Sequence, residues 1–193
     1  MFERMTQTRT VVWQALHFTG LEHLTLTPEA VGLQARSAIV GLDDGQGYRL
    51  DYRVSCDAGM RVREARLAID GGVSLHLLSD GQGAWTDAAG QPLPALAGCI
   101  DIDISATPFT NTLPIRRVAW RAGQSEAFRM AFITVPSLAL SVEPQRYTCL
   151  RQGGDGALFR FESLDGGFTA DLPVDADGLV LDYPGLFRRL WPR

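Results

Sequence analysis

The stretch GCIDIDISATPFTNTLPIRR, Gly98 to Arg117, lies near the midpoint of the 193-residue chain. It opens with strict alternation of apolar and polar residues, which predicts a half-buried β-strand. It continues through a segment rich in Thr and Asn between Pro108 and Pro114, and it ends on two arginines. We interpret it as the junction between two halves of one fold.

The second part of this stretch predicts an ordered connection rather than a flexible linker. It contains two prolines and no glycine, and proline fixes φ. The side chains of Thr107, Thr110, Asn111 and Thr112 can hydrogen-bond the local backbone. The same hydroxyl and amide groups, with the guanidinium groups that follow them, suit a sugar or phosphate head group.

Outward from the junction, the chain repeats itself weakly. YRLDYRV (Tyr48–Val54) alternates as a half-buried strand does, and FRMAFIT (Phe128–Thr134) begins the same way eighty residues further on. In both copies the alternation of apolar and polar residues shifts by one position, which predicts a bulge or tight turn near Glu64 and Pro144. These features predict one domain over 1–193 with internal repeats at about 11–105 and 106–193, in which Leu33–Ser105 superposes on Leu113–Phe187.

Turn chemistry favours the same β-rich interpretation. DGQG occurs at Asp44–Gly47 and at Asp80–Gly83, and Asp-Gly suits the positive φ of tight hairpin turns. Helical periodicity is weak except in the tail that starts at Pro184. The sequence therefore predicts an all-β protein, with antiparallel strands in two duplicated repeats that form a barrel or paired half-barrels and with a short C-terminal helical tail.

Composition excludes several classes of function. Hydrophobic residues make up 46% and charged residues 21%, and the formal net charge is −4, so no global basic field attracts nucleic acid. The chain has no lysine, which excludes Schiff-base chemistry and the lysine of a phosphate-binding loop. No apolar run is long enough for a signal peptide or a membrane span, so we expect a cytoplasmic protein without integral membrane association.

The cysteines and histidines show no ligand spacing. Cys56, Cys99 and Cys149 are sparse and odd in number, which favours a reducing compartment over a disulfide framework. Three scattered histidines complete no metal-ligand pattern, and no nucleotide fingerprint is present, so we expect neither a metal nor another cofactor. Cys149 aligns with Ile69 of the first repeat, which predicts a core position. The large aromatic residues are also expected in the core: Trp13, Trp85, Phe109 and Trp120.

Asp101 and Asp103 share one face of the junction strand and lie about 7 Å apart along it. Three interpretations stay open: pairing with Arg116 or Arg117, plain solvation, and an acid/base pair for glycoside hydrolysis. We favour them in that order, with only one of the two arginines joining the aspartates. Glu22 is expected at the surface.

Three segments carry a resemblance to a known family: GCIDIDISATPFTNTLPIRR, VPSLALSVEPQRYT and GLVLDYPGLFRR. They resemble a bacterial family described as glycolipid-binding and formerly as a domain of unknown function. The likeness extends from Trp13 to Phe187. It implies a β-rich, barrel-like fold with an internal duplication, similar in shape to the half-barrels of periplasmic lipoprotein carriers, and it implies no catalytic residue.

The leading hypothesis is non-enzymatic binding of an amphiphilic small molecule, a glycolipid, in an apolar cavity. The acyl chains would lie along Leu50, Tyr52, Met130 and Phe132. The alternatives are a hydrolase of a glycan or glycolipid that uses Asp101, Asp103 or Glu22, and a scaffold with a filled core. The sequence sets no oligomeric state. The expected ligand-binding residues are Asp101, Asp103, Thr110, Asn111, Arg116, Arg117 and Arg146.

Overall fold

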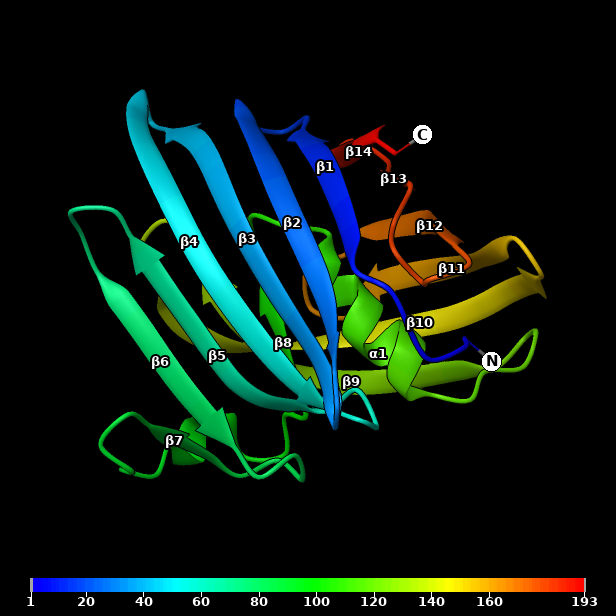
Figure 1. Cartoon of the computed structure of the whole chain (residues 1–193), viewed down its shortest axis with the longest axis horizontal. Helices are drawn as coiled ribbons and strands as arrows, with labels where there is room; N and C mark the ends of the chain where they lie inside the picture. Colours follow the sequence, from blue (N-terminus) through cyan, green and yellow to red (C-terminus); the bar gives the residue numbers. More distant parts are fainter. Residues whose placement is uncertain (1, 193) are drawn as a thin grey trace.

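A computed structural model describes residues 2–192, which fold into two β-sheets (Figure 1). In Figure 1 the larger sheet lies in front, and the strands of the smaller sheet run across it from behind. The larger sheet has the order β13-β14-β1-β2-β3-β4-β5-β6-β7, and the smaller one has the order β12-β11-β10-β9-β8.

The larger sheet contains β1 (Arg9–Ala15), β2 (Gly20–Glu29), β3 (Gly32–Asp43), β4 (Gln46–Asp57), β5 (Val62–Ile69), β6 (Ser74–Ser79), β7 (Trp85–Asp87), β13 (Asp182–Tyr183) and β14 (Phe187–Trp191). The smaller sheet contains β8 (Asp101–Ile104), β9 (Ser125–Thr134), β10 (Ala139–Gly153), β11 (Gly156–Ser163) and β12 (Thr169–Asp175). The helical segments are η1 (Pro94–Leu96), η2 (Phe109–Asn111) and α1 (Thr112–Arg117).

The predicted hairpin turns are confirmed. Asp43 pairs with Gln46 at the end of the β3–β4 hairpin, where Asp44 and Gly45 have φ values of 46° and 76°. Positive φ at both central residues matches the right-handed twist of the flanking strands. Gly81, in the second DGQG between β6 and β7, has a φ of 73°.

One of the two predicted strand irregularities is confirmed. The β4–β5 register shifts where Ser55 pairs with Glu64 and Cys56 pairs with Val62, which leaves one extra residue in β5. The prediction near Pro144 was wrong, because β10 pairs with β9 without a shift from Ala139 to Thr148. Val142 packs partly buried against the larger core group and Tyr147 is buried in the smaller one, so apolar residues change from one face of β10 to the other without a bulge.

Of the two predicted arrangements, a barrel or paired half-barrels, the closed barrel was wrong, because the two sheets are open. Within residues 2–192 the larger sheet ends at β13 and β7, and the smaller sheet ends at β12 and β8. The predicted C-terminal helical tail is also corrected, since Phe187–Trp191 forms β14 and pairs antiparallel with β1. Phe187 and Arg189 are buried while Arg188 is exposed, and this period of two is that of a strand.

The junction stretch forms β8 of the smaller sheet and the crossover that leads to β9 of the same sheet. Its strand, β8, pairs with β9 in parallel, whereas the other strand pairs of both sheets that the structure describes are antiparallel. Parallel neighbours need a long crossover, which η2 and α1 provide here. The prediction that this segment is an ordered connection is confirmed, but its helical form was not expected.

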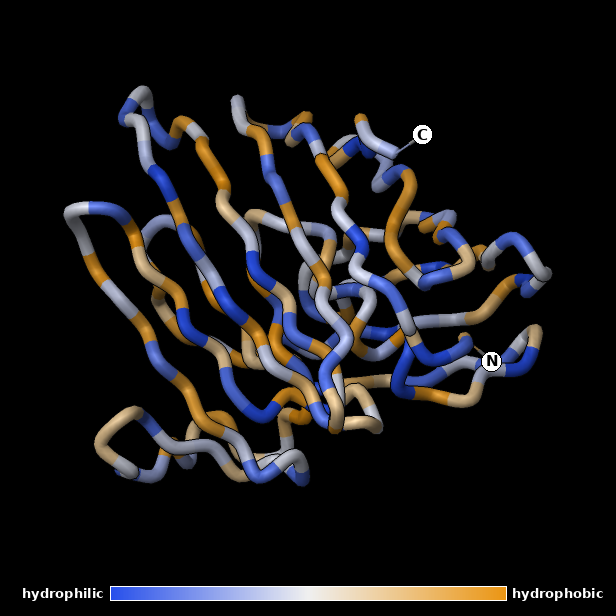
Figure 2. The backbone as a smooth tube through the Cα atoms, in the orientation of Figure 1, coloured by the Kyte–Doolittle hydropathy of each residue, from blue (hydrophilic) through white to orange (hydrophobic). Residues whose placement is uncertain are grey.

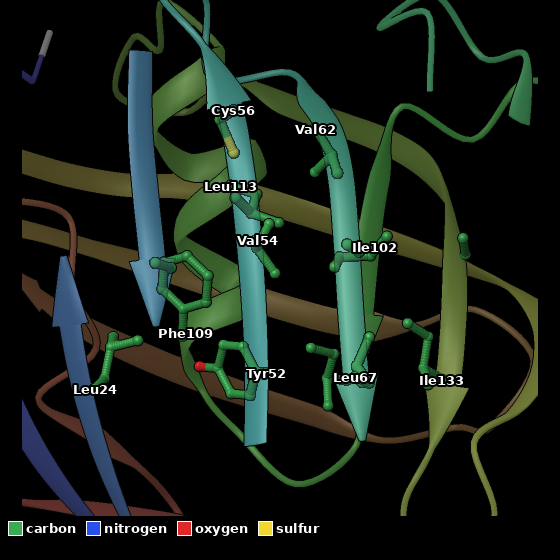
Figure 3. Close-up of a cluster of buried hydrophobic side chains, with 14 of the residues drawn as sticks. Leu24, Tyr52, Val54, Cys56, Val62, Leu67, Ile102, Phe109, Leu113 and Ile133 are labelled. Atoms are coloured by element: carbon green, nitrogen blue, oxygen red, sulfur yellow. The ribbon is translucent and has the colours of Figure 1, made fainter. Parts of the chain in front are cut away.

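Two groups of buried side chains make up the core. The larger group lies between β2–β5 and the pair β8–β9 (Figure 3), and Figure 2 shows the apolar residues that alternate along these strands. The smaller group lies between β10–β12 and the C-terminal segment. Leu113 belongs to the first group and Ile115 to the second, so α1 packs between them. The structure confirms that the residues predicted to lie in the core are buried: Trp13, Trp85, Phe109, Trp120 and Cys149.

The predicted superposition of the two halves does not hold at its start, because Leu33 lies in a strand, β3, and Leu113 lies in a helix, α1. The chain from β4 to β7 and the chain from β9 to β12 nevertheless both form four-stranded antiparallel meanders. Over residues 2–192, no helix has the length and hydropathy that a bilayer crossing requires.

Candidate functional site

The two aspartates of β8 have different partners. Asp101 is 1% exposed, and both of its oxygens accept hydrogen bonds from the guanidinium of Arg117, at 2.5 to 3.2 Å. The same guanidinium lies 5.1 Å from the centre of the Phe128 ring. Burial raises the pKa of Asp101, and the hydrogen bonds and charge of Arg117 oppose that rise. Asp101 therefore anchors the crossover to β8.

Asp103 has neutral partners. Thr110 donates its hydroxyl to Oδ1 at 2.8 Å, and Gln145 donates its amide to Oδ2 at 2.6 Å. Burial raises the pKa of Asp103 against these hydrogen bonds. Within residues 2–192 no arginine pairs with Asp103, so the network predicted for both aspartates includes only Asp101, and Arg117 alone joins it.

Asp103 borders a cleft of about 330 Å³ between the smaller sheet, the crossover and the C-terminal segment. One wall is polar and includes Asp103, Thr107, Asn111 and Gln145. A second wall is aromatic and includes Phe161, Phe168, Tyr183 and Phe187. The remaining lining residues are Ile104, Ser105, Phe132, Glu143, Ser163 and Leu186.

The aromatic wall is a continuous set of ring contacts. The ring centres of Phe161, Phe168 and Tyr183 lie 5.9 to 6.2 Å from one another, and Phe187 lies 6.2 Å from Tyr183. Edge-to-face and tilted rings at these distances attract one another beyond their burial. Phe168 is 37% exposed, so it forms the rim of the cleft.

Hydrogen bonds also fix the polar wall. Tyr147 donates its hydroxyl to the side-chain oxygen of Asn111 at 2.8 Å, and the Asn111 amide donates to the carbonyl of Pro108 at 3.2 Å. Gln145 is held by its bond to Asp103. Side chains with such partners present a fixed set of donors and acceptors to the cleft.

Glu22 lies beside the polar wall, and the prediction that it is at the surface was wrong. It points inward from β2, is 3% exposed, and accepts hydrogen bonds from Ser37 at 2.7 Å and Tyr52 at 2.6 Å. Its Oε2 has no hydrogen-bond partner among residues 2–192. Burial raises the pKa of Glu22 to about 7, and the polar side chains of Thr107, Tyr52 and Ser37 oppose that rise.

Of the seven predicted binding residues only Asp103 and Asn111 line the cleft, and Asp101 and Arg117 pair with each other outside it. Arg116 donates to the backbone carbonyls of Asp177 and Glu3, at 2.7 and 2.6 Å. Arg146 alternates with buried Gln145 and Tyr147, so it faces the other side of β10, where it lies 3.7 Å from Glu162. Asn111 lines the cleft with Asp103, and Thr110 holds Asp103 in place.

The apolar stripe predicted to line a cavity is mostly filled core. Leu50 and Tyr52 pack in the larger buried group, and Met130 is 1% exposed. Of the four residues only Phe132 reaches the cleft. Sequence reasoning missed Gln145, Phe161, Phe168 and Tyr183, although GGFT and DYPGLF contain two of these aromatic residues.

The part of the chain that the structure describes contains no group of three metal-ligating side chains. Its three cysteines are free and buried.

Fold and cleft together define a two-sheet β protein with a small site that has one polar and one aromatic wall. Over residues 10–189 the chain matches the family described as "Putative glycolipid-binding", and it belongs to that family. A crystal structure of a DUF1089 family protein from Pseudomonas aeruginosa is 44% identical and superposes with a TM-score of 0.80, over 89% of this chain and 92% of that one. The sequence matches no curated protein.

Proposed function

We propose that the chain binds an amphiphile, a glycolipid, whose saccharide head group enters the cleft. The observation that carries the proposal is that one cleft is lined by a group of aromatic rings and by a carboxyl and two amides. A sugar ring has apolar C–H faces that pack on aromatic rings, and its hydroxyl groups both donate and accept hydrogen bonds. Asp103, Asn111 and Gln145 offer these hydroxyls acceptors and donors, and few, well-placed polar groups are typical of ligand sites.

The size of the cleft supports a head group rather than a whole lipid. Its volume of about 330 Å³ is at the small end of the range for ligand pockets. Because Leu50 and Tyr52 belong to filled core, no acyl chain is expected between them. We place the acyl chain of the ligand instead along the exposed rim at Phe168, with Phe132 and Leu186 beside it.

Titration calorimetry with octyl glucoside below its micelle concentration tests this proposal. We expect Asp103→Asn and Phe168→Ala each to weaken binding at least tenfold, since one removes the carboxylate and the other the rim aromatic. Arg146→Ala is the control, because it faces away from the cleft. Binding that all three variants retain, or that Arg146→Ala also loses, would contradict the proposal.

A hydrolase is the second candidate, supported by one observation. Two carboxyl groups line the cleft, those of Asp103 and Glu143, and burial raises the pKa of Asp103 as a general acid requires. Asp101 and Glu22, the other acids considered from the sequence, do not line it. Turnover of nitrophenyl glycosides that Asp103→Asn and Glu143→Gln both abolish would favour the hydrolase. Binding without turnover would favour the carrier.

We also infer that the two meanders arose by duplication within one domain. Asp87 ends β7 and Asp175 ends β12, and the Oδ1 atom of each accepts from the amides two and four residues on, a turn that Asp57 and Asp80 also make. At the ends of β7 and β12 the residue before the aspartate also forms a bridge six residues on, Thr86 with Pro92 and Val174 with Val180. A superposition of β4–β7 on β9–β12 should place Asp87 on Asp175. A different match would contradict a common origin.

A further inference from the structure

The outer face of the larger sheet is uncovered across β2–β6 (Figure 1). Along these strands, residues that alternate with the buried ones point away from the smaller sheet. Side chains of this face line a shallow hollow of about 630 Å³. The cleft lies on the inner side, so the two sites are independent and this inference does not rest on the proposed function.

Three arginines form a row across this face. Arg36 of β3 pairs in register with Arg53 of β4, and Arg53 pairs with Arg66 of β5. Neighbouring strands lie about 4.8 Å apart, so three positive charges share about 10 Å. Like charges directly opposite each other on a sheet destabilise it. The fold itself therefore gains nothing from the row.

Carboxylates compensate this row only in part. Arg66 contacts Glu64 at 2.7 Å, and Glu64 also contacts His76 at 2.9 Å. Arg36 donates to a neutral group, the amide oxygen of Gln34, at 2.6 Å. Arg53 has no ion pair with any residue in the range 2–192, and the carboxylate that lines the hollow, that of Asp51, pairs with Arg49 at 2.9 Å. An anion that approached the hollow would meet all three guanidinium groups.

Exposed aliphatic residues lie on the same face. Leu21 and Val40 are directly opposite each other on β2 and β3, and they are 51% and 61% exposed. Leu42, two residues further along β3, is 47% exposed. Val40 is four residues from Arg36, about 13 Å along the strand. Scattered exposed aliphatics are ordinary, but a paired set beside a cationic row is typical of surfaces that contact lipid.

We propose that this outer face docks on an anionic lipid bilayer. The arginine row binds lipid phosphates, which guanidinium groups match bidentately, and Leu21 and Val40 enter the head-group region. A nucleic acid fits this face less well. Of the residues that line the hollow, Tyr52 is the only non-histidine aromatic, and it points inward and is buried, so no Phe, Tyr or Trp ring there is free to stack on bases. A free phosphate would use the arginines and leave the aliphatic residues unexplained.

Co-sedimentation with vesicles tests the proposal. We expect binding to phosphatidylcholine vesicles that contain phosphatidylglycerol, and none to pure phosphatidylcholine, with affinity that falls as salt rises. Each arginine near an anionic surface contributes about fivefold in affinity, so Arg36→Gln with Arg53→Gln should weaken binding about 25-fold. Val40→Ser should also weaken vesicle binding, because it removes an aliphatic side chain without changing the charge of the protein.

The matched control is Arg151→Gln with Arg160→Gln, which makes the same charge change at exposed positions on the smaller sheet. Circular dichroism of each variant checks that the fold is kept. Three results would overturn the proposal: equal binding to both kinds of vesicle, equal loss in the control variant, or vesicle binding unaffected by Val40→Ser. Arginine-dependent binding of single-stranded DNA or of inorganic phosphate, without vesicle binding, would assign the row to that ligand instead.

Discussion

Glu22→Gln should change how the stability of this protein depends on pH. The carboxyl is buried among Ser37, Tyr52 and Thr107, and its pKa is about 7 in the folded protein against 4.5 as its ordinary value. Above pH 4.5 the unfolded chain releases this proton, whereas the folded chain keeps it until about pH 7. Stability is therefore lost as pH rises between these two values, and the loss is constant above them.

The size of the effect follows from the shift. Each unit of pKa difference corresponds to about 1.4 kcal/mol, so the full effect is about 3 kcal/mol. It amounts to about 1 kcal/mol at pH 5 and to the full value near pH 8.5. Glutamine keeps the shape and an acceptor oxygen but cannot ionise. The free energy of unfolding of the variant, relative to that of wild type, should therefore rise by about 2.5 kcal/mol from pH 5 to pH 8.5.

Urea unfolding of both proteins at pH 5 and pH 8.5 measures this difference. With a typical urea dependence for a chain of this size, the midpoint of the variant should shift by about 1 M relative to wild type. Asp101 and Asp103 titrate equally in both proteins and cancel in the comparison. Glu29→Gln, at an exposed end of the same strand, is the control. Midpoints of wild type and Glu22→Gln that change in parallel with pH would refute the reasoning.

Three further changes test the packing of the fold. Arg117→Met leaves the carboxylate of Asp101 buried and unpaired, and it should cost about 3 to 5 kcal/mol, most of which Asp101→Asn in the same chain should restore. Gly32→Ala puts a Cβ 1.9 Å from the carbonyl oxygen of Cys56, so β3 and β4 must separate locally and the midpoint of urea unfolding should fall. Phe109→Ala removes a fully buried ring and should cost about 3 to 5 kcal/mol. An unchanged midpoint in any of the three would contradict the contact concerned.

Local patterns predicted the strands well because they depend on neighbouring residues. The alternation of CIDIDIS and YRLDYRV placed β8 and β4, and the Asp-Gly pairs placed the hairpin turns. The tail was misread because FRRLW has too few residues to separate a period of two from a helical turn. Its pairing with β1 decided the matter.

The site was predicted less well than the fold. The sequence identified Asp103, Thr110 and Asn111, which lie near one another along the chain and meet through the short crossover. Gln145 meets Asp103 across 42 residues of chain, which no local pattern reports. Arg146 was chosen for its charge, although its neighbours in β10 show that it faces outward.

The sequence by itself determined the β-rich class, several of the strands, the tight turns and the position of the crossover, since alternation and turn residues act over a few neighbours. The tertiary structure decided which faces became interior. Glu22 shares one face of β2 with Leu24 and Leu26, so a second layer over that face buries it and raises its pKa. The arginine row likewise exists only in the strand register, because Arg36, Arg53 and Arg66 are distant in sequence and come together when three strands pair.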